Sequence, residues 1–586
     1  MYNNDPLKNV LYIDLSKKTF EVKDRHDLFD KYIGGAGVAS KLLLEECPEG
    51  ADPLSHENPI IFAVGPLTGV FPLASKTIAM FKSPHTGNLG ESHAGGRSAI
   101  AIRFAGYGAI VIKGKSDIPC YISVNGSKVY FRDASTLWGM ESSFTSGRII
   151  REREENPGMR TIMRIGRGGE NLISYASVTT ETYRHFGRLG LGAVFGSKKL
   201  KAVVIGGNLS HDFKDMGSYK VLYDKIYSDA VESNLMKKYH DLGTSENVNV
   251  LNTISALPTR NLNQAVFDKV EGITGEGLAE HYLGRRIACS GCPVGCIHIA
   301  ALREPSETEL YFYKTSMISY DYELIYALGS MLGISDPEGL LKLIDRVEKY
   351  GLDIMSTGVV LSWATEALKK NLITENETSG VKLEWGDYKA YMEAVNLIIE
   401  GETDFYKTLG KGVDYASSKY GGEDFAMAFG KNEMPGYHTG PAAYLGFLIG
   451  ARHSHLDNAG YSIDEKTIPK VTLTPEETVD KLMKEEKWRC ILSSIAICFF
   501  ARGIYTPDKA MEALKITGFD ITEDVMNKIG EEIYKLKFEF KFREGFSLDN
   551  IRIPKRIFET PSPLSGWDEQ YMRKALSYAK KKITAV

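Results

Sequence analysis

The 586-residue sequence lacks the features of several protein classes. Its 71 lysines and arginines are balanced by 75 aspartates and glutamates, so no excess of positive charge favours a nucleic-acid partner. The longest apolar runs, AAYLGFLIGA and CILSSIAICFF, are too short to span a bilayer. The first residues, MYNNDPLKNVLYIDL, carry no positive-then-apolar signal pattern. We therefore expect a soluble, cytoplasmic protein that binds neither nucleic acid nor membrane.

Cysteine is also scarce, with seven in the whole chain, and three of them lie close together as Cys289, Cys292 and Cys296. So few cysteines in a large chain favour a reducing compartment without structural disulfides. The spacing C-x2-C-x3-C, with glycines and a proline bending the backbone, suits three corners of a cubane iron–sulfur cluster. The fourth ligand must then come from far along the chain, and Cys490 and Cys498 are the downstream candidates.

Two alternatives to a cluster remain open for this cysteine triplet. A structural zinc site normally needs a second nearby pair of Cys or His, and only His298 lies close in sequence. The three thiols could also be unligated. The radical S-adenosylmethionine arrangement fits poorly, because its C-x3-C-x2-C spacing runs in the reverse order.

Glycine is abundant, with 57 residues, and it is concentrated before residue 210. Four glycine-rich stretches stand there: YIGGAGVASKLL, GNLGESHAGGRS, RIGRGGENL and FGRLGLGAVFGSKKLKA. Such loops bring backbone N–H groups to phosphates, and Arg97 and Arg188 stand beside two of them. Tight turns are the alternative explanation. Since none follows the strand–GxGxxG–helix pattern and no GxxxxGK[ST] occurs, we expect a phosphorylated cofactor other than a nicotinamide or a bound nucleoside triphosphate.

The hydrophobic pattern divides the chain into a strand-rich part and a helical part. Runs such as LYIDLSKKTFEV, PIIFAVGPL, GAIVIKG and CYISVNGSKVYF predict strands and hairpins, the last with an Asn-Gly turn. After residue 208, PEGLLKLIDRVEKYG and TGVVLSWATEALKKN repeat apolar residues at helical spacing. We expect an α+β multidomain protein, with a β-rich domain over 1–208 and two mainly α-helical domains over 209–430 and 431–586.

Two short stretches echo each other, Ser330-Met-Leu-Gly-Ile-Ser335 and Ser493-Ser-Ile-Ala-Ile-Cys498. The similarity is weak enough to arise by chance. If it is meaningful, the two stretches would present equivalent groups to the halves of a pseudo-symmetric ligand.

Taken together, these motifs resemble the tungsten- or molybdenum-dependent aldehyde:ferredoxin oxidoreductases over essentially the whole chain. The resemblance covers IDLSKKTFEV, YIGGAGVASKLL, GPLTG, FKSPHTGNLGESHAGG and GRLGLGAVFGSKKLKAVVIGG, then the cysteine triplet, YELIYALGSMLGI and SSIAIC. It implies a tungsten (or molybdenum) bis-pyranopterin cofactor on the N-terminal domain, a magnesium ion bridging the pterin phosphates, and a 4Fe-4S cluster that passes electrons to ferredoxin.

The resemblance also assigns residues to these groups. Cys289, Cys292, Cys296 and Cys498 would hold the cluster, which leaves Cys490 as a buried thiol. The cofactor-binding positions would be Lys76, Ser92, His93, Ala94, Gly95, Phe186, Gly187, Arg188, Ser330, Gly333, Ser493 and Ile497.

For catalysis, the resemblance implies Glu323 as the acid/base and His455 as a hydrogen-bond donor to the substrate oxygen. Tyr437, His438 and His453 would complete the pocket wall. Each has a plainer explanation, since Glu323 could be a paired carboxylate in an apolar helix and His453 and His455 could be satisfied core histidines.

The chain departs from the family at several positions. Ser330 and Ser493 stand where the family has aspartates, and a hydroxyl offers a weaker, neutral bond to a pterin ring than a carboxylate does. His93 stands where Asn is common, and Asp457 where a basic residue is common. No E-x-x-H occurs, so we expect no iron-bridged dimer of the kind that some relatives form.

The expected function is oxidation of aldehydes to carboxylic acids, with ferredoxin or a small iron–sulfur subunit as the electron acceptor. Two alternatives lie within the family: an enzyme of 2-hydroxycarboxylates, and the catalytic subunit of an aryl-CoA reductase. An alternative of another class is a zinc-binding scaffold without enzymatic activity.

Overall fold

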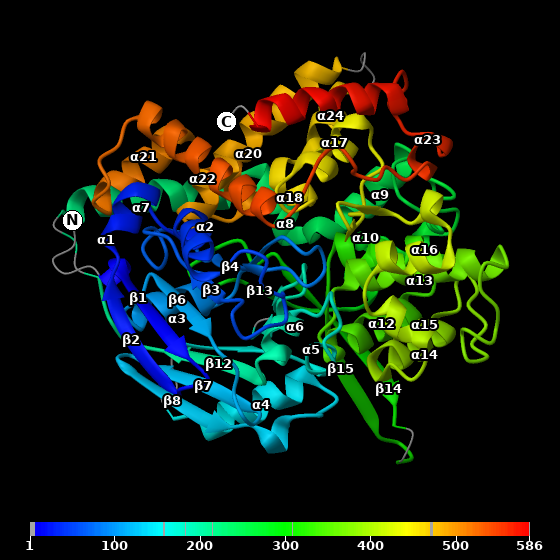
Figure 1. Cartoon of the computed structure of the whole chain (residues 1–586), viewed down its shortest axis with the longest axis horizontal. Helices are drawn as coiled ribbons and strands as arrows, with labels where there is room; N and C mark the ends of the chain where they lie inside the picture. The colour runs from blue at the N-terminus through cyan, green and yellow to red at the C-terminus, as the bar shows by residue number, and fades with distance from the viewer. Residues whose placement is uncertain are drawn as a thin grey trace.

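The computed structural model describes residues 6–155, 159–181, 183–211, 213, 215–306, 309–468 and 473–584. Its N-terminal part contains two six-stranded sheets (Figure 1). The first has the strand order β2-β1-β6-β3-β4-β5, with β1 Asn9–Asp14, β2 Thr19–Asp24, β3 Ile60–Ala63, β4 Thr77–Lys82, β5 Leu89–Ala94 and β6 Ala109–Lys113. The second has the order β11-β10-β9-β12-β7-β8, with β7 Cys120–Asn125, β8 Lys128–Asp133, β9 Arg160–Arg164, β10 Val178–Thr180, β11 Arg184–Phe186 and β12 Leu200–Gly206.

The strands that the hydrophobic pattern predicted in this part are confirmed. The register of β1 and β2 runs from Asn9 opposite Asp24 to Asp14 opposite Thr19, so the pair is the expected hairpin. In the β7–β8 hairpin Asn125 pairs with Lys128, so the two loop residues are Gly126 and Ser127, directly after Asn125, with Gly126 at a positive φ of 55°. The buried strands β3, β6 and β12 carry the Ile- and Val-rich runs.

The glycine-rich stretch at residues 32–43 ends in a buried helix, α2 (Gly35–Glu46), that joins the first sheet to the C-terminal helices. One side of α2 packs on β3 and β4, and the other packs on α20 (Pro475–Ser494) and α22 (Glu523–Arg543). Gly35 has no room for a side chain, because a Cβ would lie 2.2 Å from the carbonyl oxygen of Ser493. Helices α20 and α22, near the C-terminus, therefore lie over the sheet that the N-terminal strands form, with α2 between them, as Figure 1 shows.

The rest of the chain is mainly helical, as expected. Between residues 216 and 420 lie α7 Met216–Glu232, α8 Asn234–Asp241, α9 Asn247–Thr253, α10 Gly275–His281, α11 Tyr322–Leu328, α12 Pro337–Tyr350, α13 Ile354–Lys369, α14 Tyr388–Glu400, α15 Asp404–Leu409 and α16 Val413–Tyr420. After these come α17 Pro441–Ile449, α18 His455–Asn458, α19 Gly460–Thr467, α20 Pro475–Ser494, α21 Pro507–Ile516, α22 Glu523–Arg543, α23 Arg556–Glu559 and α24 Glu569–Thr584. Among the described residues, no helix is both long enough and apolar enough to cross a bilayer.

A three-stranded antiparallel sheet interrupts the helical part and was not expected from the sequence. Its strands are β13 Leu283–Ile287, β14 Ile297–Pro305 and β15 Tyr313–Tyr320, in that order. The cysteine triplet forms the connection between β13 and β14. A two-stranded pair, β16 Ala428–Phe429 and β17 Asn432–Glu433, lies near the predicted domain boundary at residue 430.

Candidate active site

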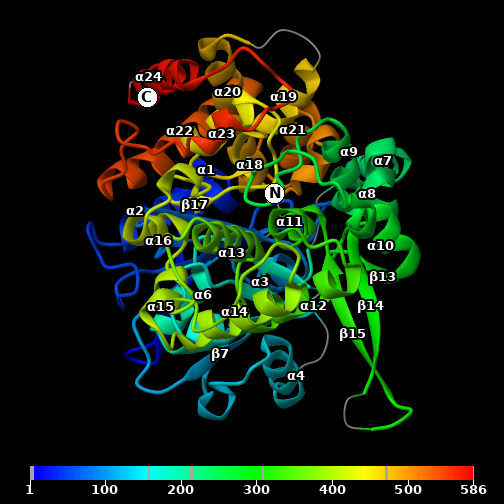
Figure 2. The same cartoon turned by 90° about the vertical axis from the view of Figure 1, so that its right-hand side faces the viewer.

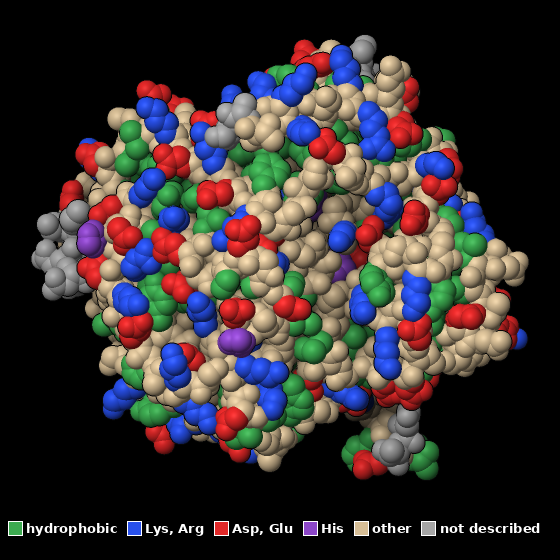
Figure 3. Space-filling view, in the orientation of Figure 1, with side chains coloured by type: hydrophobic (Ala, Val, Ile, Leu, Met, Phe, Trp, Pro, Cys, Tyr) green, Lys and Arg blue, Asp and Glu red, His purple; other side chains and the backbone are tan. Residues whose placement is uncertain are grey.

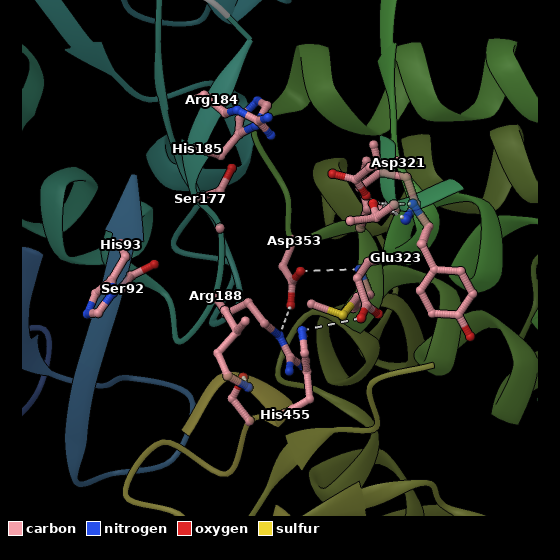
Figure 4. Close-up of a pocket in the computed structure, with 18 of the residues that line it drawn as sticks. Ser92, His93, Ser177, Arg184, His185, Arg188, Asp321, Glu323, Asp353 and His455 are labelled. Atoms are coloured by element: carbon pink, nitrogen blue, oxygen red, sulfur yellow. Dashed lines mark hydrogen bonds and ion pairs between the residues drawn. The ribbon is translucent and has the colours of Figure 1, made fainter. Parts of the chain in front are cut away.

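A cavity of about 320 Å³ lies where the N-terminal sheets meet the two helical regions. Figure 4 shows side chains entering it from β5, from the segment after β11, from the start of α11 and from α18. Nine of the residues predicted for the cofactor or for catalysis line it: Lys76, Ser92, His93, Gly95, Gly187, Arg188, Glu323, Tyr437 and His455. Residues up to 379 positions apart in sequence, from Lys76 to His455, therefore converge on one space.

The four predicted cluster cysteines are brought together by one backbone segment. Leu73 N donates to Gly291 O at 3.2 Å inside the triplet, and Leu73 O accepts from Cys498 N at 3.0 Å. Burial raises the pKa of Cys296 to about 11, and the nearby thiols of Cys498 and Cys289 add to this rise. The sulfur atoms of residues 289 to 498 thus share one neighbourhood.

The spacing of these thiols bears on the zinc alternative. Among the described residues, no group of three or more His, Cys, Asp or Glu side chains is close enough to hold a single metal ion. Tetrahedral zinc would bring its thiolates to about 3.8 Å from one another, since each Zn–S bond is about 2.3 Å long. A cubane binds each thiolate to a different iron and keeps the sulfurs farther apart. The described residues therefore form no ready-made site for a single zinc ion.

The cluster region and the cavity touch at Gly95. A Cβ at this position would lie 2.7 Å from Cys289 Sγ and 3.4 Å from Lys76 Nζ. Only glycine leaves room for the thiol and the ammonium to approach the chain together. Lys76 also lines the cavity, and its backbone N–H donates to Ala496 O at 3.2 Å, two residues before Cys498.

The predicted acid/base Glu323 and His455 face each other on one wall of the cavity. Glu323 Oε1 lies 3.4 Å from His455 Nε2, and Glu323 Oε2 accepts from Gly436 N at 3.3 Å. Burial raises the pKa of Glu323 to about 8, because the hydrogen bonds from Gly436 N and the Tyr437 side chain do not compensate for lost hydration. Burial and then Arg188 hold the pKa of His455 well below its usual range. At neutral pH this wall therefore holds a protonated carboxyl beside a neutral imidazole.

A rigid ion-pair network positions Arg188 on the adjoining wall. Arg188 Nε lies 3.0 Å from Asp353 Oδ2, and its Nη2 donates to Glu433 O at 2.7 Å. Glu433 in turn bonds His85 Nε2 at 2.7 Å and accepts from Ser356 Oγ at 2.6 Å. Burial alone would raise the pKa of Glu433, but His85 and Ser356 lower it to about 2. Arg188 is thus held by the Asp353 carboxyl group and by the main-chain carbonyl of Glu433, whose side chain belongs to the same network.

The opposite end of the cavity carries a second set of titratable groups, near Arg184 and His185 in Figure 4. His185 Nε2 lies 4.0 Å from Glu348 Oε1, which accepts from Ser319 Oγ at 2.8 Å. Burial raises the pKa of Glu348 to about 8 and lowers that of His185 to about 3. The Glu348–His185 pair is therefore uncharged at neutral pH, and the charge at this end is that of Arg184, whose pKa nearby acidic groups raise above its usual value in spite of burial.

His93 belongs to a buried network in the wall of the cavity, with Glu91 and Arg452. Its Nε2 lies 2.7 Å from Glu91 Oε1, and Glu91 Oε2 lies 2.7 Å from Lys537 Nζ. Burial would raise the pKa of Glu91, but Lys537 and Arg452 hold it well below its usual range. Ser92 and His93 lie on strand β5 rather than in the loop that the sequence suggested. When the Nε2–H group of a neutral His93 donates to Glu91, the other ring nitrogen, Nδ1, is free to accept a hydrogen bond.

Seven predicted site residues do not border the cavity: Ala94, Phe186, Ser330, Gly333, His438, Ser493 and Ile497. The Ser330 hydroxyl donates to Pro258 O at 2.8 Å, inside the protein. His438 contacts Tyr444 through Nδ1 and lies 3.0 Å from Thr560 O through Nε2. Because both ring nitrogens are engaged away from the cavity, a direct catalytic role for His438 finds no support in this geometry. Likewise, His453 contacts Lys541 Nζ at 2.8 Å and is not part of the cavity wall.

Several site residues were missed in the sequence, notably Asp353, Glu348, Asp321 and Glu433. Asp353 had a local signal, because it caps α13 by accepting from Met355 N at 3.2 Å and Ser356 N at 3.3 Å. Asp321 similarly caps α11. Glu433 lies in KNEMPG, where nothing local distinguishes it from a surface acid.

Profiles of known families match almost the whole chain. The N-terminal domain of aldehyde ferredoxin oxidoreductase matches residues 10–207, and domains 2 and 3 match residues 221–582. The chain belongs to the aldehyde ferredoxin oxidoreductase family. It is therefore an oxidoreductase with a β-rich N-terminal part and a mainly helical remainder.

Two relatives in sequence and one solved structure with the same fold illustrate what the chain is similar to. A tungsten-containing aldehyde ferredoxin oxidoreductase of Thermococcus kodakarensis is 31% identical over 94% of this chain and 91% of its own length. An aliphatic sulfonate oxidoreductase, WOR-like subunit, of Pyrococcus furiosus is 32% identical over 67% of this chain and 64% of its own length. The active site complex BamBC of benzoyl coenzyme A reductase shares the fold, with a TM-score of 0.83 at 21% identity over 98% of this chain and 94% of that chain.

Proposed function

We propose that this family member oxidises aldehydes to carboxylic acids with a tungsten (or molybdenum) bis-pyranopterin, and that electrons leave through a 4Fe-4S cluster. The observation that carries the proposal is the meeting of two kinds of group at one cavity. The Glu323–His455 pair can move a proton on one wall, and Gly95 on another wall lies directly beside Cys289 Sγ, 2.7 Å from where a Cβ would stand. Tungsten-containing relatives at about the same length as this chain support the choice of metal chemistry.

The cavity has the character expected of a site for a large polar cofactor. Several polar atoms that border it are buried and have no hydrogen-bond partner among the described residues: Ser177 Oγ, Arg188 Nη1, Asn432 Oδ1 and His455 Nδ1. Buried polar atoms ordinarily form hydrogen bonds, so we expect these four atoms to bind a ligand that has donors and acceptors of its own.

Lys76, Ser92, His93, Gly187 and Arg188 would hold the pterin and its phosphates, with magnesium between the phosphates. Cys289, Cys292, Cys296 and Cys498 would hold the cluster. Gly95 would support the phosphate contacts at the cavity wall. Behind the wall, Ala94 and Phe186 would support the phosphate contacts, and Ser330, Gly333, Ser493 and Ile497 would support the ring contacts. The seven free thiols of the chain support a reducing location such as the cytoplasm.

When bound, the tungsten pterin supplies the two-electron redox chemistry. Oxidation of an aldehyde adds one water oxygen and releases two electrons and two protons. Glu323, as a carboxylate, accepts one of these protons at the wall of the cavity. When Glu323 is protonated, its O–H can donate to His455 Nε2, and the imidazole then presents Nδ1–H to the substrate oxygen. Tyr437 stacks on Tyr461, with ring centroids 4.1 Å apart, and fixes the apolar side of this wall.

A direct test uses anaerobically purified protein and a viologen dye as the electron acceptor. We expect dye reduction with short aldehydes. An enzyme that is inert to aldehydes but turns over 2-hydroxycarboxylates or an aryl-CoA would contradict the proposed substrate and leave the family chemistry in place. A protein that contains only zinc and reduces no dye would contradict both.

A further inference from the structure

A second pocket, of about 330 Å³, lies beside the active cavity. We call it the Arg164 pocket. Helix α4 (Ser143–Arg153) forms one side of it, and residues of β9, of β10 and of the segment after β10 form the other. Helix α4 packs on β9 and α12, in the lower part of the molecule in Figures 1 and 2. The volume of this pocket lies within the range of small-molecule sites.

Three arginines and one glutamate line the pocket, namely Arg148, Arg151, Arg164 and Glu181. Arg148 and Arg151 lie one turn apart on α4, and both are exposed. Exposed cations alone select no ligand, because acidic and basic side chains are intermingled over the face of the molecule that Figure 3 shows. The distinguishing feature is Arg164, since only 5% of this residue is exposed.

The Arg164 guanidinium donates to main-chain carbonyls rather than to a carboxylate. Its Nε donates to Ser143 O at 2.8 Å, and its Nη1 lies 3.3 Å from Ile162 O and 3.5 Å from Thr179 O. Among the described residues, no carboxylate forms an ion pair with Arg164, and its Nη2 makes no hydrogen bond. Burial lowers the pKa of Arg164 to about 10, so the side chain is still charged at neutral pH. A buried cation without a paired anion is unfavourable, and an anionic ligand would stabilise it.

The surrounding residues are shaped for this guanidinium. A Cβ at Gly147 would lie 2.4 Å from Arg164 Nε and 2.8 Å from its Cζ, so only glycine lets α4 approach it. The centroid of the Phe144 ring lies 5.6 Å from Arg164 Cζ. The one acid of the pocket, Glu181, is directed to β9, where its Oε2 accepts from Ile162 N at 2.8 Å. The pocket therefore has a fixed cation at its base, and its one carboxylate is engaged elsewhere.

The Arg164 pocket shares a wall with the active cavity. Tyr183 borders both spaces. Ser143, whose carbonyl accepts from Arg164, also donates from its Oγ to Glu348 O at 3.4 Å, and Glu348 lines the active cavity. A molecule bound at Arg164 therefore lies next to the end of the active cavity that carries Arg184.

We propose that the Arg164 pocket binds a phosphate group. One guanidinium fork matches a carboxylate, whereas a phosphate group has three or more acceptor oxygens and a charge of about −2, and so accepts from several arginines at once. Arg164 at the base, with Arg148 and Arg151 on α4, offers donors from two elements. The phosphate group comes either from free phosphate or from the far end of a substrate that reaches the active cavity past Tyr183. The second source rests on the proposed function, and the first does not.

The test compares Arg148→Gln/Arg151→Gln, the pocket variant, with Arg153→Gln/Lys128→Gln, which also removes two exposed cations but lies outside the pocket. Cofactor-loaded enzyme is dialysed to equilibrium against inorganic phosphate at low ionic strength. We expect saturable binding in the parent. The pocket variant should raise the Kd by about tenfold or more, because it loses charge-assisted hydrogen bonds, and the control should stay within about twofold of the parent.

A third variant, Arg164→Lys, tests the base of the pocket. It keeps the positive charge but loses the guanidinium fork, so the Kd should rise here too. Thermal melting shows whether this variant is folded, and the pocket variant decides the question if it is not. The proposal is wrong if the parent shows no saturable binding of phosphate, or if the pocket variant and the control change the Kd equally.

The source of the phosphate group is identified with two aldehydes of equal length, one of which has a terminal phosphate, and with viologen as the electron acceptor. If the substrate supplies the group, kcat/KM should be about tenfold or more higher for the phosphorylated aldehyde, and inorganic phosphate should compete with it. The pocket variant should lose this preference, and a preference that it retains would contradict the substrate as the source. Equal kcat/KM for both aldehydes, with phosphate binding intact, assigns the pocket to free phosphate. An enzyme inert to both aldehydes would reject the proposed substrate and leave the dialysis result unchanged.

Discussion

Glu323 and Glu433 lie in neighbouring regions of the same site, yet their surroundings give them opposite charge states. The Glu323 side chain is 16% exposed and that of Glu433 is not exposed at all. Burial raises the pKa of Glu323 to about 8, whereas His85 and Ser356 overcome the effect of burial on Glu433 and lower its pKa to about 2. The hydrogen-bond donors around each carboxyl group, rather than how deeply it is buried, therefore decide its charge state.

This difference separates a role at the wall of the cavity, for Glu323, from a role behind the wall, for Glu433. Glu323, whose donors do not compensate for its burial, can gain and lose a proton near neutral pH. Glu433, with strong donors on both oxygens, stays ionised and supports the Arg188–Asp353 pair. Removing each carboxyl should therefore affect different properties of the enzyme.

The largest expected effect is on catalysis, from Glu323→Gln. Loss of a positioned acid/base should lower kcat by about 10²- to 10⁴-fold. Metal content and thermal stability should stay close to those of the parent, because Glu323 makes no strong ion pair. Anaerobic turnover and elemental analysis check both parts, with the exposed Glu402→Gln as the matched control. A variant that keeps full activity would remove Glu323 from the mechanism.

The next effect is on stability, from Glu433→Gln. Breaking a buried charged pair leaves its partners unsatisfied and should cost about 3–5 kcal/mol. The midpoint of urea unfolding should fall, whereas turnover per metal centre should fall far less than in Glu323→Gln. The wild-type contribution of Glu433 is complete above about pH 4.5 and is lost as pH falls toward about 2, since the folded state lowers its pKa. An unchanged midpoint would show that the two glutamates do not differ in role.

The smallest effect is a shift with pH. If Glu323 accepts a proton during oxidation, kcat/KM should rise with pH through a pKa of about 8, because only the carboxylate can act as base. The Glu323→Gln variant should lose this limb, and Glu433→Gln should keep it, since Glu433 is ionised throughout that range. A profile that is flat between pH 6 and 9 in the parent, within about twofold, would contradict the assignment.

Sequence patterns predicted the fold well where the signal was local. Alternating residues and the Asn125-Gly126 turn gave the N-terminal strands, and helical spacing gave α12 and α13. The β13–β15 sheet was missed, because its strands flank a cysteine loop and one of them carries exposed aromatics. Its alternation in YKTSMISY was available, but the helical composition on either side outweighed it.

The site was predictable in a different way. The triplet was evident from spacing alone, but the choice of Cys498 over Cys490, and the Glu323–His455 pair, came from the family resemblance. Glu323 and His455 are 132 positions apart in sequence, and no local pattern predicts that their side chains lie 3.4 Å from each other. Glu433 and Glu348 were missed for the same reason, since their role depends on partners contributed by other elements.

The central claim is that four cysteines distant in sequence hold one iron–sulfur cluster beside a cavity built for a tungsten or molybdenum cofactor. Elemental analysis of anaerobically isolated protein tests it most directly, with Cys498→Ser and the buried Cys490→Ser measured alongside. We predict tungsten or molybdenum with about four irons per chain in the parent and in Cys490→Ser, and a clear loss of iron in Cys498→Ser. Zinc in place of iron, or equal iron in both variants, would contradict the account.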